Sequence, residues 1–252
     1  MTEDSKNSIR FASINIEFDR HYERVFPFVK NFGPDVLCLQ EVLDADISLF
    51  EREFNMKCVF VPMVGLRRIQ NDLSSPMVNF GIAIFSKIPI QGFQADYYGG
   101  NPDIVPQFFE EYPVGMALIN KVLLSASLLF EGVLYTFATT HFTWSNHGLV
   151  TDEQRTDLVK LFAILDTKSE FILSGDFNAP RGREIFTTIA SRYKDNIPPE
   201  YTTSIDKNLH RAGDLGFMVD GLFTTPRYVA TEVKLTDGVS DHMAITALAH
   251  KM

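Results

Sequence analysis

Residues 171–182 read FILSGDFNAPRG, and no other stretch of the sequence indicates the fold so clearly. The apolar residues 171–173 are typical of a strand that is buried on both faces. The strand runs into Gly175, beyond which Asp176 and Asn178 stand two residues apart. Side chains at positions i and i+2 of an extended segment point to the same side, so a carboxylate and an amide can share one task there. An ordinary Asx turn is the alternative interpretation of this motif taken alone.

Short apolar runs of the same kind alternate with helical patterns along the rest of the chain. The spacing of apolar residues predicts helices over 22–32, 43–54 and 151–165, the last opened by a capping box of Thr151 and Gln154. Strands rich in Val, Ile, Leu and Phe are predicted at residues 9–16, 36–39, 57–62, 81–86, 116–124, 133–141, 171–174, 219–223, 228–235 and 242–249. This order predicts an α/β (α+β) fold in which two sheets pack together with helices outside.

The chain of 252 residues has no internal repeat, no low-complexity tract and no linker rich in Pro, Gly or Ser. We therefore expect a single domain over residues 9–252, preceded by a flexible segment at residues 1–8. The stretch 94–113, QADYYGGNPDIVPQFFEEYP, shows no period and is expected to be a long irregular loop. Such a loop either packs its own aromatic side chains or forms a flap that touches substrate.

The charge and the apolar runs of the chain exclude some classes of protein. Acidic residues outnumber basic ones by 32 to 23, a net charge of −9, which excludes a broadly basic protein that coats nucleic acid but allows a local basic or metal-filled cleft. Cys38 and Cys58 lie in apolar runs and are expected to be reduced. No apolar run approaches the ~18 residues of a membrane-spanning helix, and residues 1–10 lack the apolar segment of a signal peptide. We expect a soluble, monomeric protein of the cytoplasm.

Residues with polar, reactive side chains stand at the ends of several predicted strands. Each has an ordinary structural interpretation, such as a carboxylate near a helix N-terminus for Glu41 or a satisfied core histidine for His141. Asp220 lies inside an apolar strand, where an unpaired carboxylate is costly. Because six such coincidences within one domain are improbable, the pattern favours a shared site of Asn15, Glu41, His141, Asp176, Asn178, Asp220, Asp241 and His242.

These residues, in this order, resemble the endonuclease/exonuclease/phosphatase superfamily of metal-dependent phosphoesterases. Any one motif is weak, but their order is specific. The resemblance implies a four-layered sandwich of two packed, mostly antiparallel sheets flanked by helices, with the site at one edge of the sheets. The matching motifs, within residues 9–249, are S-I-N at 13–15, L-Q-E at 39–41, T-T-H-F at 139–142, G-D-F-N at 175–178, V-D-G-L-F at 219–223 and S-D-H at 240–242.

The resemblance also implies how the metal and the attacking water would be held. Glu41, assisted by Asn15 and Asp241, would bind Mg²⁺, for which Mn²⁺ can substitute. Asp176 would orient and deprotonate the attacking water, and Asn178 would position it against the phosphate.

Two histidines would act on the phosphate itself. His141 and His242 would bind its oxygens as negative charge builds in a phosphorane-like transition state, and Asp220 would fix the tautomer of His242. Three positions depart from the superfamily pattern. Ile14 stands where Trp or Tyr usually precedes the Asn, His141 stands where abasic-site endonucleases carry a tyrosine, and Met-Val at 218–219 replaces their arginine. The last two departures point away from abasic-site repair, while the T-H motif does not choose among the other branches.

The leading hypothesis for the function is Mg²⁺-dependent hydrolysis of a phosphodiester in nucleic acid or a nucleic-acid adduct. The alternative is a lipid or small-molecule phosphoesterase (sphingomyelinase- or inositol-phosphatase-like), favoured by the acidic surface and by the aromatic loop 97–112, which could touch a membrane surface. A catalytically inactive binding module is disfavoured, because an inactive site has no need of so many carboxylates. Basic side chains that could bind a substrate backbone are Arg67, Arg68, Arg181 and Arg183, with the His210-Arg211 pair.

Overall fold

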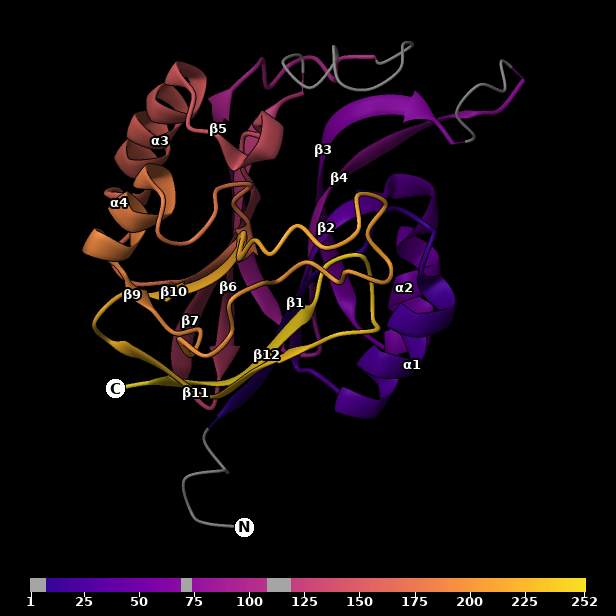
Figure 1. The fold of residues 1–252 in the computed structure, drawn as a ribbon. Helices are drawn as coiled ribbons and strands as arrows, with labels where there is room; N and C mark the ends of the chain where they lie inside the picture. Colours follow the sequence, from indigo (N-terminus) through magenta and orange to yellow (C-terminus); the bar gives the residue numbers. More distant parts are fainter. Residues whose placement is uncertain (1–7, 69–73, 108–118) are drawn as a thin grey trace.

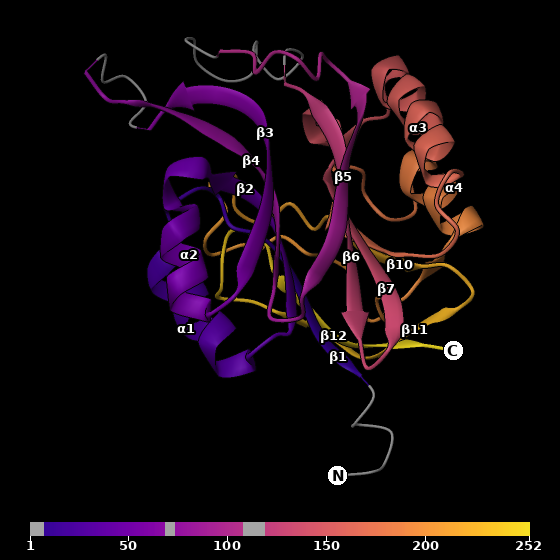
Figure 2. The same cartoon turned by 180° about the vertical axis from the view of Figure 1, so that it is seen from behind.

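The structure is a computed structural model that describes residues 8–68, 74–107 and 119–252. Two sheets pack face to face at its centre, and two α-helices cover the outer face of each (Figures 1 and 2). The predicted four-layered sandwich is therefore confirmed. The helices are α1 (Tyr22–Phe32), α2 (Ile47–Phe54), α3 (Asp152–Leu165) and α4 (Glu184–Arg192).

Each sheet contains six strands in the described part of the chain. The first is made of β1 (Ile9–Asn15), β2 (Val36–Leu43), β3 (Lys57–Arg67), β4 (Met77–Ser86), β11 (Tyr228–Thr236) and β12 (Ala244–Lys251). The second is made of β5 (Ile90–Gly99), β6 (Lys121–Phe130), β7 (Val133–His141), β8 (Ile172–Asp176), β9 (Lys194–Asp195) and β10 (Asp220–Thr224). Their orders are β11-β12-β1-β2-β4-β3 and β5-β6-β7-β8-β10-β9. Among the described strands only β1–β2 and β7–β8 pair in parallel, so both sheets are mostly antiparallel, as expected.

Three apolar layers hold the sandwich together. Between the sheets, Phe11 of β1 stacks on Phe137 of β7 with ring centroids 5.4 Å apart. On the outer face of the first sheet, buried residues of β1 and β2 pack against α1 and α2, and α3 and α4 cover the second sheet in the same way. This arrangement explains why many strands carry apolar residues on both faces. Each sheet is covered by the other sheet on one side and by helices on the other over most of its width.

The strand pairing explains why polar residues far apart in the sequence meet. Parallel β1 and β2 bring Asn15 beside Gln40, and parallel β7 and β8 bring His141 beside Asp176. Strand β10 runs antiparallel to β8 and begins with Asp220 directly opposite Asp176. The polar ends of these strands therefore lie at one end of the sandwich.

Some predicted boundaries were wrong. Residues 94–99, expected to be irregular, form the end of β5, an edge strand whose partly exposed side chains give no clear period. Tyr98 of this strand is buried and stacks on Phe142 rather than facing outward. The rest of the proposed membrane-contacting loop, including Phe108 and Phe109, falls partly on residues 108–112, which lie outside the described residues.

Helix α4 was not predicted, although Ile185, Phe186 and Ile189 give it a buried face at helical spacing. The helix predicted over 43–54 begins only at Ile47, because Leu43 still belongs to β2. The predicted strand 116–124 corresponds to β6, and its residues 116–118 lie outside the described residues, as do residues 1–7 of the segment 1–8 that was expected to be flexible.

The structure bears on two expectations from the sequence, the lack of a membrane-spanning helix and the reduced state of the two cysteines. Within the described ranges no helix is both long enough and apolar enough to cross a membrane. Cys38 is buried, Cys58 is half-buried, and both are free thiols.

Candidate active site

A cavity of about 290 Å³ opens at the end of the sandwich where the polar strand ends meet. Part of its wall is polar and is formed by Glu41, His141, Asp176, Asn178, Asp241 and His242. The remaining wall is mainly apolar and includes Phe18, Leu66, Phe80, Trp144, Leu215 and Phe217. The other two predicted site residues, Asn15 and Asp220, are buried and bind these polar residues through hydrogen bonds.

Asp176 is the residue of the polar wall that the others contact most. Its Oδ1 accepts the backbone N–H of Asn178 at 2.8 Å, and its Oδ2 accepts a hydrogen bond from Asn15 Nδ2 at 3.2 Å. The Nε2 atoms of His141 and His242 lie 3.5 and 3.7 Å from the same Oδ2. A carboxylate held at the cavity wall among such donors has the geometry of a general base.

His242 is bound from behind by Asp220. The Nδ1 atom of His242 lies 2.8 Å from Asp220 Oδ2, so the imidazole donates to the carboxylate through the nitrogen that faces away from Asp176. Burial by itself would lower the pKa of His242, but the charges of Asp220 and Asp176 raise it well above its ordinary value. His242 is therefore a cation at neutral pH, and the carboxylate of Asp220 has the partner that its burial in β10 requires.

The second imidazole is in the opposite state. Burial lowers the pKa of His141 more than the nearby charge of Asp176 raises it, so His141 is neutral at neutral pH. Its ring packs edge-on against Phe80, with centroids 6.0 Å apart. Its Nδ1 is buried and has no hydrogen-bond partner in the described part of the chain. The site thus combines one cationic and one neutral histidine around Asp176.

Glu41 is directed into the cavity by an irregularity in β2. The pairing of β2 with β4 shifts its register between Gln40 and Val42, and Glu41 has a φ of 61°. A bulge of this kind re-aims a side chain. Burial, followed by the charge of Asp241, raises the pKa of Glu41 to about 8. The described residues therefore do not fully compensate a negative charge on the Glu41 carboxylate.

These carboxylates fit a divalent cation. Glu41 and Asp241 offer the hard oxygen donors that Mg²⁺ prefers, and a cation would offset the burial and the charge of Asp241, which together raise the pKa of Glu41. Asn15 Nδ2 donates to Glu41 Oε1 at 3.2 Å, and Asn15 Oδ1 accepts the backbone N–H of Glu17 at 3.2 Å. The predicted metal-binding residues are thus brought together, and Asn15 holds Glu41 in place.

The loops that carry the site are fixed to each other from behind by α3. Gln154 is buried and donates from Nε2 to the carbonyl oxygens of Thr143 and Asn178, at 2.8 and 3.3 Å. The side chain of Asn178 in turn donates to the carbonyl oxygen of Phe142 at 3.0 Å. The loop after β7 and the loop after β8 are therefore held in one arrangement.

Two of the arginines predicted to contact substrate bind the protein. Arg181 forms an ion pair with Asp195 at 2.8 Å and donates to carbonyl oxygens of the segment 197–201. Arg183 donates to the carbonyl oxygens of residues 147 and 148, both at 2.7 Å. These guanidinium groups connect α4 and its preceding turn to neighbouring loops.

The other predicted pair is engaged in the same way. Arg68 forms ion pairs with Asp46 at 2.9 Å and with Asp19 at 3.1 Å, and Arg67 donates to the carbonyl oxygen of Ser75 at 3.1 Å. None of these four arginines is among the described residues that line the cavity, whereas His210 and Arg211, which were also predicted to contact substrate, do line it. The charges of Arg68 and Arg181 are paired within the protein, whereas Arg67 and Arg183 donate to backbone carbonyl oxygens.

The cavity also contains residues that the sequence did not single out. Glu17 and Arg20 come from the turn after β1, and Trp144 comes from the loop after β7. For Glu17 a signal was present, because Asn15 and Glu17 stand two residues apart at the end of a strand, as in the Asp-x-Asn motif at 176–178.

A model of the endonuclease/exonuclease/phosphatase family matches residues 12–242, whereas a search of curated proteins finds no match. Similar solved structures include an endonuclease/exonuclease/phosphatase from Beutenbergia cavernae DSM 12333, with 14% identity, a TM-score of 0.75 and coverage of 97% of this chain and 72% of that one. The human Nocturnin catalytic domain with bound sulfate anion is 17% identical, with a TM-score of 0.70 and coverage of 98% and 94%.

A mannosyl-6-phosphatase from Bacteroides thetaiotaomicron VPI-5482 is 13% identical, with a TM-score of 0.67 and coverage of 96% and 99%. At these identities the solved structures establish a shared fold. The family model matches most of the chain, including every strand end that carries a predicted site residue. The chain belongs to the endonuclease/exonuclease/phosphatase family, whose members are phosphoesterase hydrolases.

Proposed function

We propose that the protein hydrolyses a phosphodiester bond in the presence of Mg²⁺, with a water molecule as the nucleophile. The observation that carries this proposal is the position of Asp176 Oδ2, which lies within 3.7 Å of Nε2 of both His141 and His242 at the wall of the cavity. A base for water and donors for phosphate oxygens are thus available at one point.

In this reaction Asp176 orients the water and accepts its proton. The cationic His242 donates to a phosphate oxygen through Nε2, and its charge is maintained by Asp220. His141, which is neutral, donates to another phosphate oxygen from the ring nitrogen that faces the cavity, and Asn178 positions the water. These groups act most strongly as charge develops on the phosphate, so they favour the transition state over the bound substrate.

Glu41 and Asp241 would hold the Mg²⁺ ion, with Asn15 keeping Glu41 in position. When bound, the ion supplies positive charge next to the phosphate oxygens, and Mn²⁺ can take its place. Repulsion from Asp241 and Asp176 contributes to the raised pKa of Glu41, and this repulsion supports the proposal that a cation belongs there.

Two substrate classes are considered: a nucleic acid or a nucleic-acid adduct, which the sequence favours, and a lipid or small-molecule phosphoester. The lining of the cavity fits the lipid or small-molecule phosphoester better. Its apolar side chains, such as Trp144 and Phe217, suit an organic group attached to the phosphate, while Arg211 supplies a cation at its wall. Of the arginines expected to bind a nucleic-acid backbone, Arg68 and Arg181 form ion pairs within the protein, whereas Arg211 lies at the cavity wall.

Hydrolysis of bis-p-nitrophenyl phosphate and of p-nitrophenyl phosphate, each with Mg²⁺ and with excess chelator, tests the proposal. We expect Mg²⁺-dependent release of nitrophenol from the diester, with Asp176→Asn as the control for contaminating activity. Faster hydrolysis of the monoester would reassign the protein to the phosphatase class. The monoester is included because the chain is similar in fold to a mannosyl-6-phosphatase. Absence of turnover of either compound would favour an inactive binding module.

A further inference from the structure

The segment 206–213, between β9 and β10, forms consecutive turns at the wall of the cavity. Its first residue, Asp206, is 2% exposed, and the carboxylate accepts three backbone N–H groups. These belong to Asn208, Leu209 and Gly238, at 2.8, 3.3 and 2.6 Å. The backbone carbonyl oxygen of Asp206 also accepts the N–H of His210 at 2.8 Å. The buried carboxylate therefore holds the turns in one conformation and ties them to the loop before β12.

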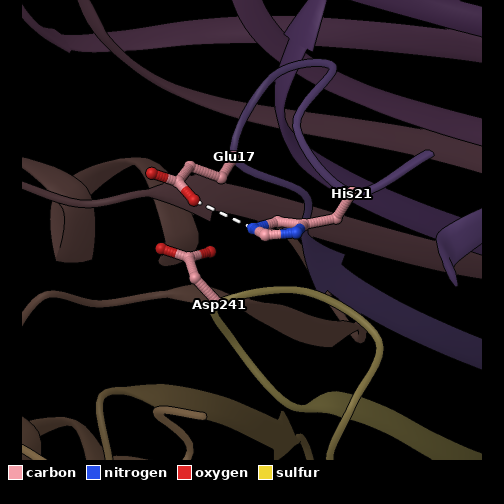
Figure 3. A group of neighbouring side chains, drawn as sticks. All are labelled: Glu17, His21 and Asp241. Carbon is pink, nitrogen blue, oxygen red and sulfur yellow. Dashed lines mark hydrogen bonds and ion pairs between the residues drawn. The ribbon is translucent and has the colours of Figure 1, made fainter. Parts of the chain in front are cut away.

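The start of this segment pairs with the loop that carries His242. Ile205 and His242 form an antiparallel bridge, and the N–H of Asp206 donates to the backbone carbonyl oxygen of Asp241 at 2.8 Å. Figure 3 shows the carboxylate of Asp241 turned toward Glu17, so the contact with Asp206 uses only the backbone of Asp241. The position of the turns relative to His242 is thus fixed by main-chain hydrogen bonds.

His210 lies on these turns, is half-buried and lines the cavity. Its Nδ1 accepts the backbone N–H of Ala212 at 3.1 Å. An accepting ring nitrogen carries no proton, so the neutral imidazole has its proton on Nε2. Nε2 has no hydrogen-bond partner in the described part of the chain and is not one of the buried unpartnered atoms there. A molecule in the cavity can therefore reach this donor.

The same hydrogen bond keeps His210 uncharged, because a protonated Nδ1 would place a second donor against the N–H of Ala212. Burial lowers the pKa of His210, and the charges of His242 and Arg211 lower it further, against the opposing charge of Asp241. His210 is therefore a neutral donor, not the basic residue that the sequence suggested. Since a neutral imidazole N–H is a very weak acid, it holds an acceptor without transferring a proton.

His210 stands next to the reaction centre. Its ring packs edge-on against that of His242, with centroids 6.4 Å apart and an angle of 69° between the planes. Nε2 of His242 lies 3.7 Å from Oδ2 of Asp176. His210 is thus one side chain away from the nitrogen that would bind a phosphate oxygen. A phosphate bound by one donor has three further oxygens, which need other donors where water is excluded.

We propose that His210 is a substrate-binding residue that donates from Nε2 to an oxygen of the phosphate group held by His242. The proposal rests on the proposed function for the identity of the ligand. Because the donor stands on a preformed turn, it contacts the bound substrate as well as the transition state, and its loss should raise KM more than it lowers kcat. The alternative is that His210 only accepts the N–H of Ala212 and so shapes the turn.

Two substitutions separate the roles of the two ring nitrogens. In His210→Asn the side-chain oxygen can still accept the N–H of Ala212, as Nδ1 does, but the donor at the position of Nε2 is lost. In His210→Gln the longer side chain places an N–H donor near the position of Nε2, and the acceptor at the position of Nδ1 is lost. A substrate-binding role is damaged by Asn and kept by Gln, whereas a purely structural role gives the opposite order.

Binding of inorganic phosphate at a fixed Mg²⁺ concentration tests the proposal without hydrolysis. Trp144, the single tryptophan of the chain, lines the cavity and reports binding by its fluorescence, and isothermal calorimetry measures the same affinity. His210→Asn should raise Kd about five- to tenfold, the usual effect of one lost hydrogen bond, and His210→Gln by less than about threefold. His250→Asn is the control and should bind as wild type does, because His250 lies on β12 and hydrogen-bonds to Thr231.

Kinetics with bis-p-nitrophenyl phosphate should show the same order in KM, and thermal unfolding checks that each variant is folded. Wild-type affinity for phosphate in folded His210→Asn would overturn the proposal, as would weaker binding by His210→Gln than by His210→Asn. Absence of phosphate binding by the wild-type protein would overturn it as well. Phosphate binding in the expected order, without hydrolysis of either nitrophenyl phosphate, would support the role of His210 and remove the proposed function.

Discussion

Nδ1 of His242 lies 2.8 Å from Oδ2 of Asp220, and Nε2 of the same ring lies 3.7 Å from Oδ2 of Asp176. One imidazole therefore connects two buried carboxylates that stand opposite each other on β8 and β10. Because both carboxylates favour the protonated ring, His242 carries a positive charge to the wall of the cavity.

Replacing Asp220 by Asn should lower the pKa of His242. The substitution keeps the shape of the side chain but removes one of the charges that raise this pKa. If hydrolysis needs the protonated ring, the alkaline limb of the pH–rate profile moves to lower pH, because His242 loses its proton earlier. The pKa is measured from the imidazole signals by NMR at a series of pH values. An unchanged titration of His242 would mean that the two residues do not interact in solution.

Replacing Asp176 by Asn should reduce kcat by about 10²- to 10⁴-fold, the usual contribution of a general base. KM should change little, because the proton transfer occurs only on the way to the transition state. Steady-state kinetics with the diester substrate give both constants. A variant that keeps more than about a tenth of kcat would make Asp176 a residue of the turn after β8 rather than the base.

The affinity for Mg²⁺ should rise with pH up to about pH 8 and level off above it. In the metal-free protein the pKa of Glu41 is raised to about 8, so below this pH the carboxyl must lose a proton before it can bind the ion. Each pH unit below 8 then weakens apparent binding by up to about tenfold. Calorimetry at pH 6.5, 7.5 and 8.5 measures the trend. Glu41→Gln serves as the control and should bind Mg²⁺ weakly, without this pH dependence.

Replacing Arg181 by Ala should lower stability and leave KM nearly unchanged. The guanidinium group is bound by Asp195 and by backbone carbonyl oxygens, and it does not line the cavity. Loss of these partly buried interactions is expected to cost about 1–3 kcal/mol of unfolding free energy. Urea denaturation gives the free energy, and kinetics give KM. A several-fold increase in KM at unchanged stability would restore Arg181 as a substrate-binding residue.

Most of the site could be predicted from the sequence because its signals are local. Asp176 and Asn178 follow an apolar run, His141 ends a strand, and Glu41 lies two residues before the end of another, so strand ends and chemically reactive side chains nearly coincide. A buried strand needs apolar residues on both faces, and this requirement is visible in a single short segment. The same reasoning predicted two packed sheets with helices outside.

Strand β5 and helix α4 show where local signals fail. Strand β5 lies at the edge of its sheet and its residues 91–94 are exposed, so few of its positions are forced to be apolar. Helix α4 begins directly after the turn that carries Arg181 and Arg183, and its apolar face is short. In both segments the secondary structure is decided by packing against neighbours that are distant in the sequence.

The sequence by itself determined which kinds of side chain stand at the strand ends, because strand formation and burial depend on nearby residues. Only the tertiary structure decided the partner of each charge. In the sequence Arg68 and Arg181 have no visible partner, but in the structure they pair with Asp46 and Asp195. Asp241 instead lies beside Glu17 and His21, and one of its oxygens accepts no hydrogen bond from the described residues. The energy of a charge depends on distances of a few ångströms to groups elsewhere in the chain, and those distances are fixed only when the two sheets pack together.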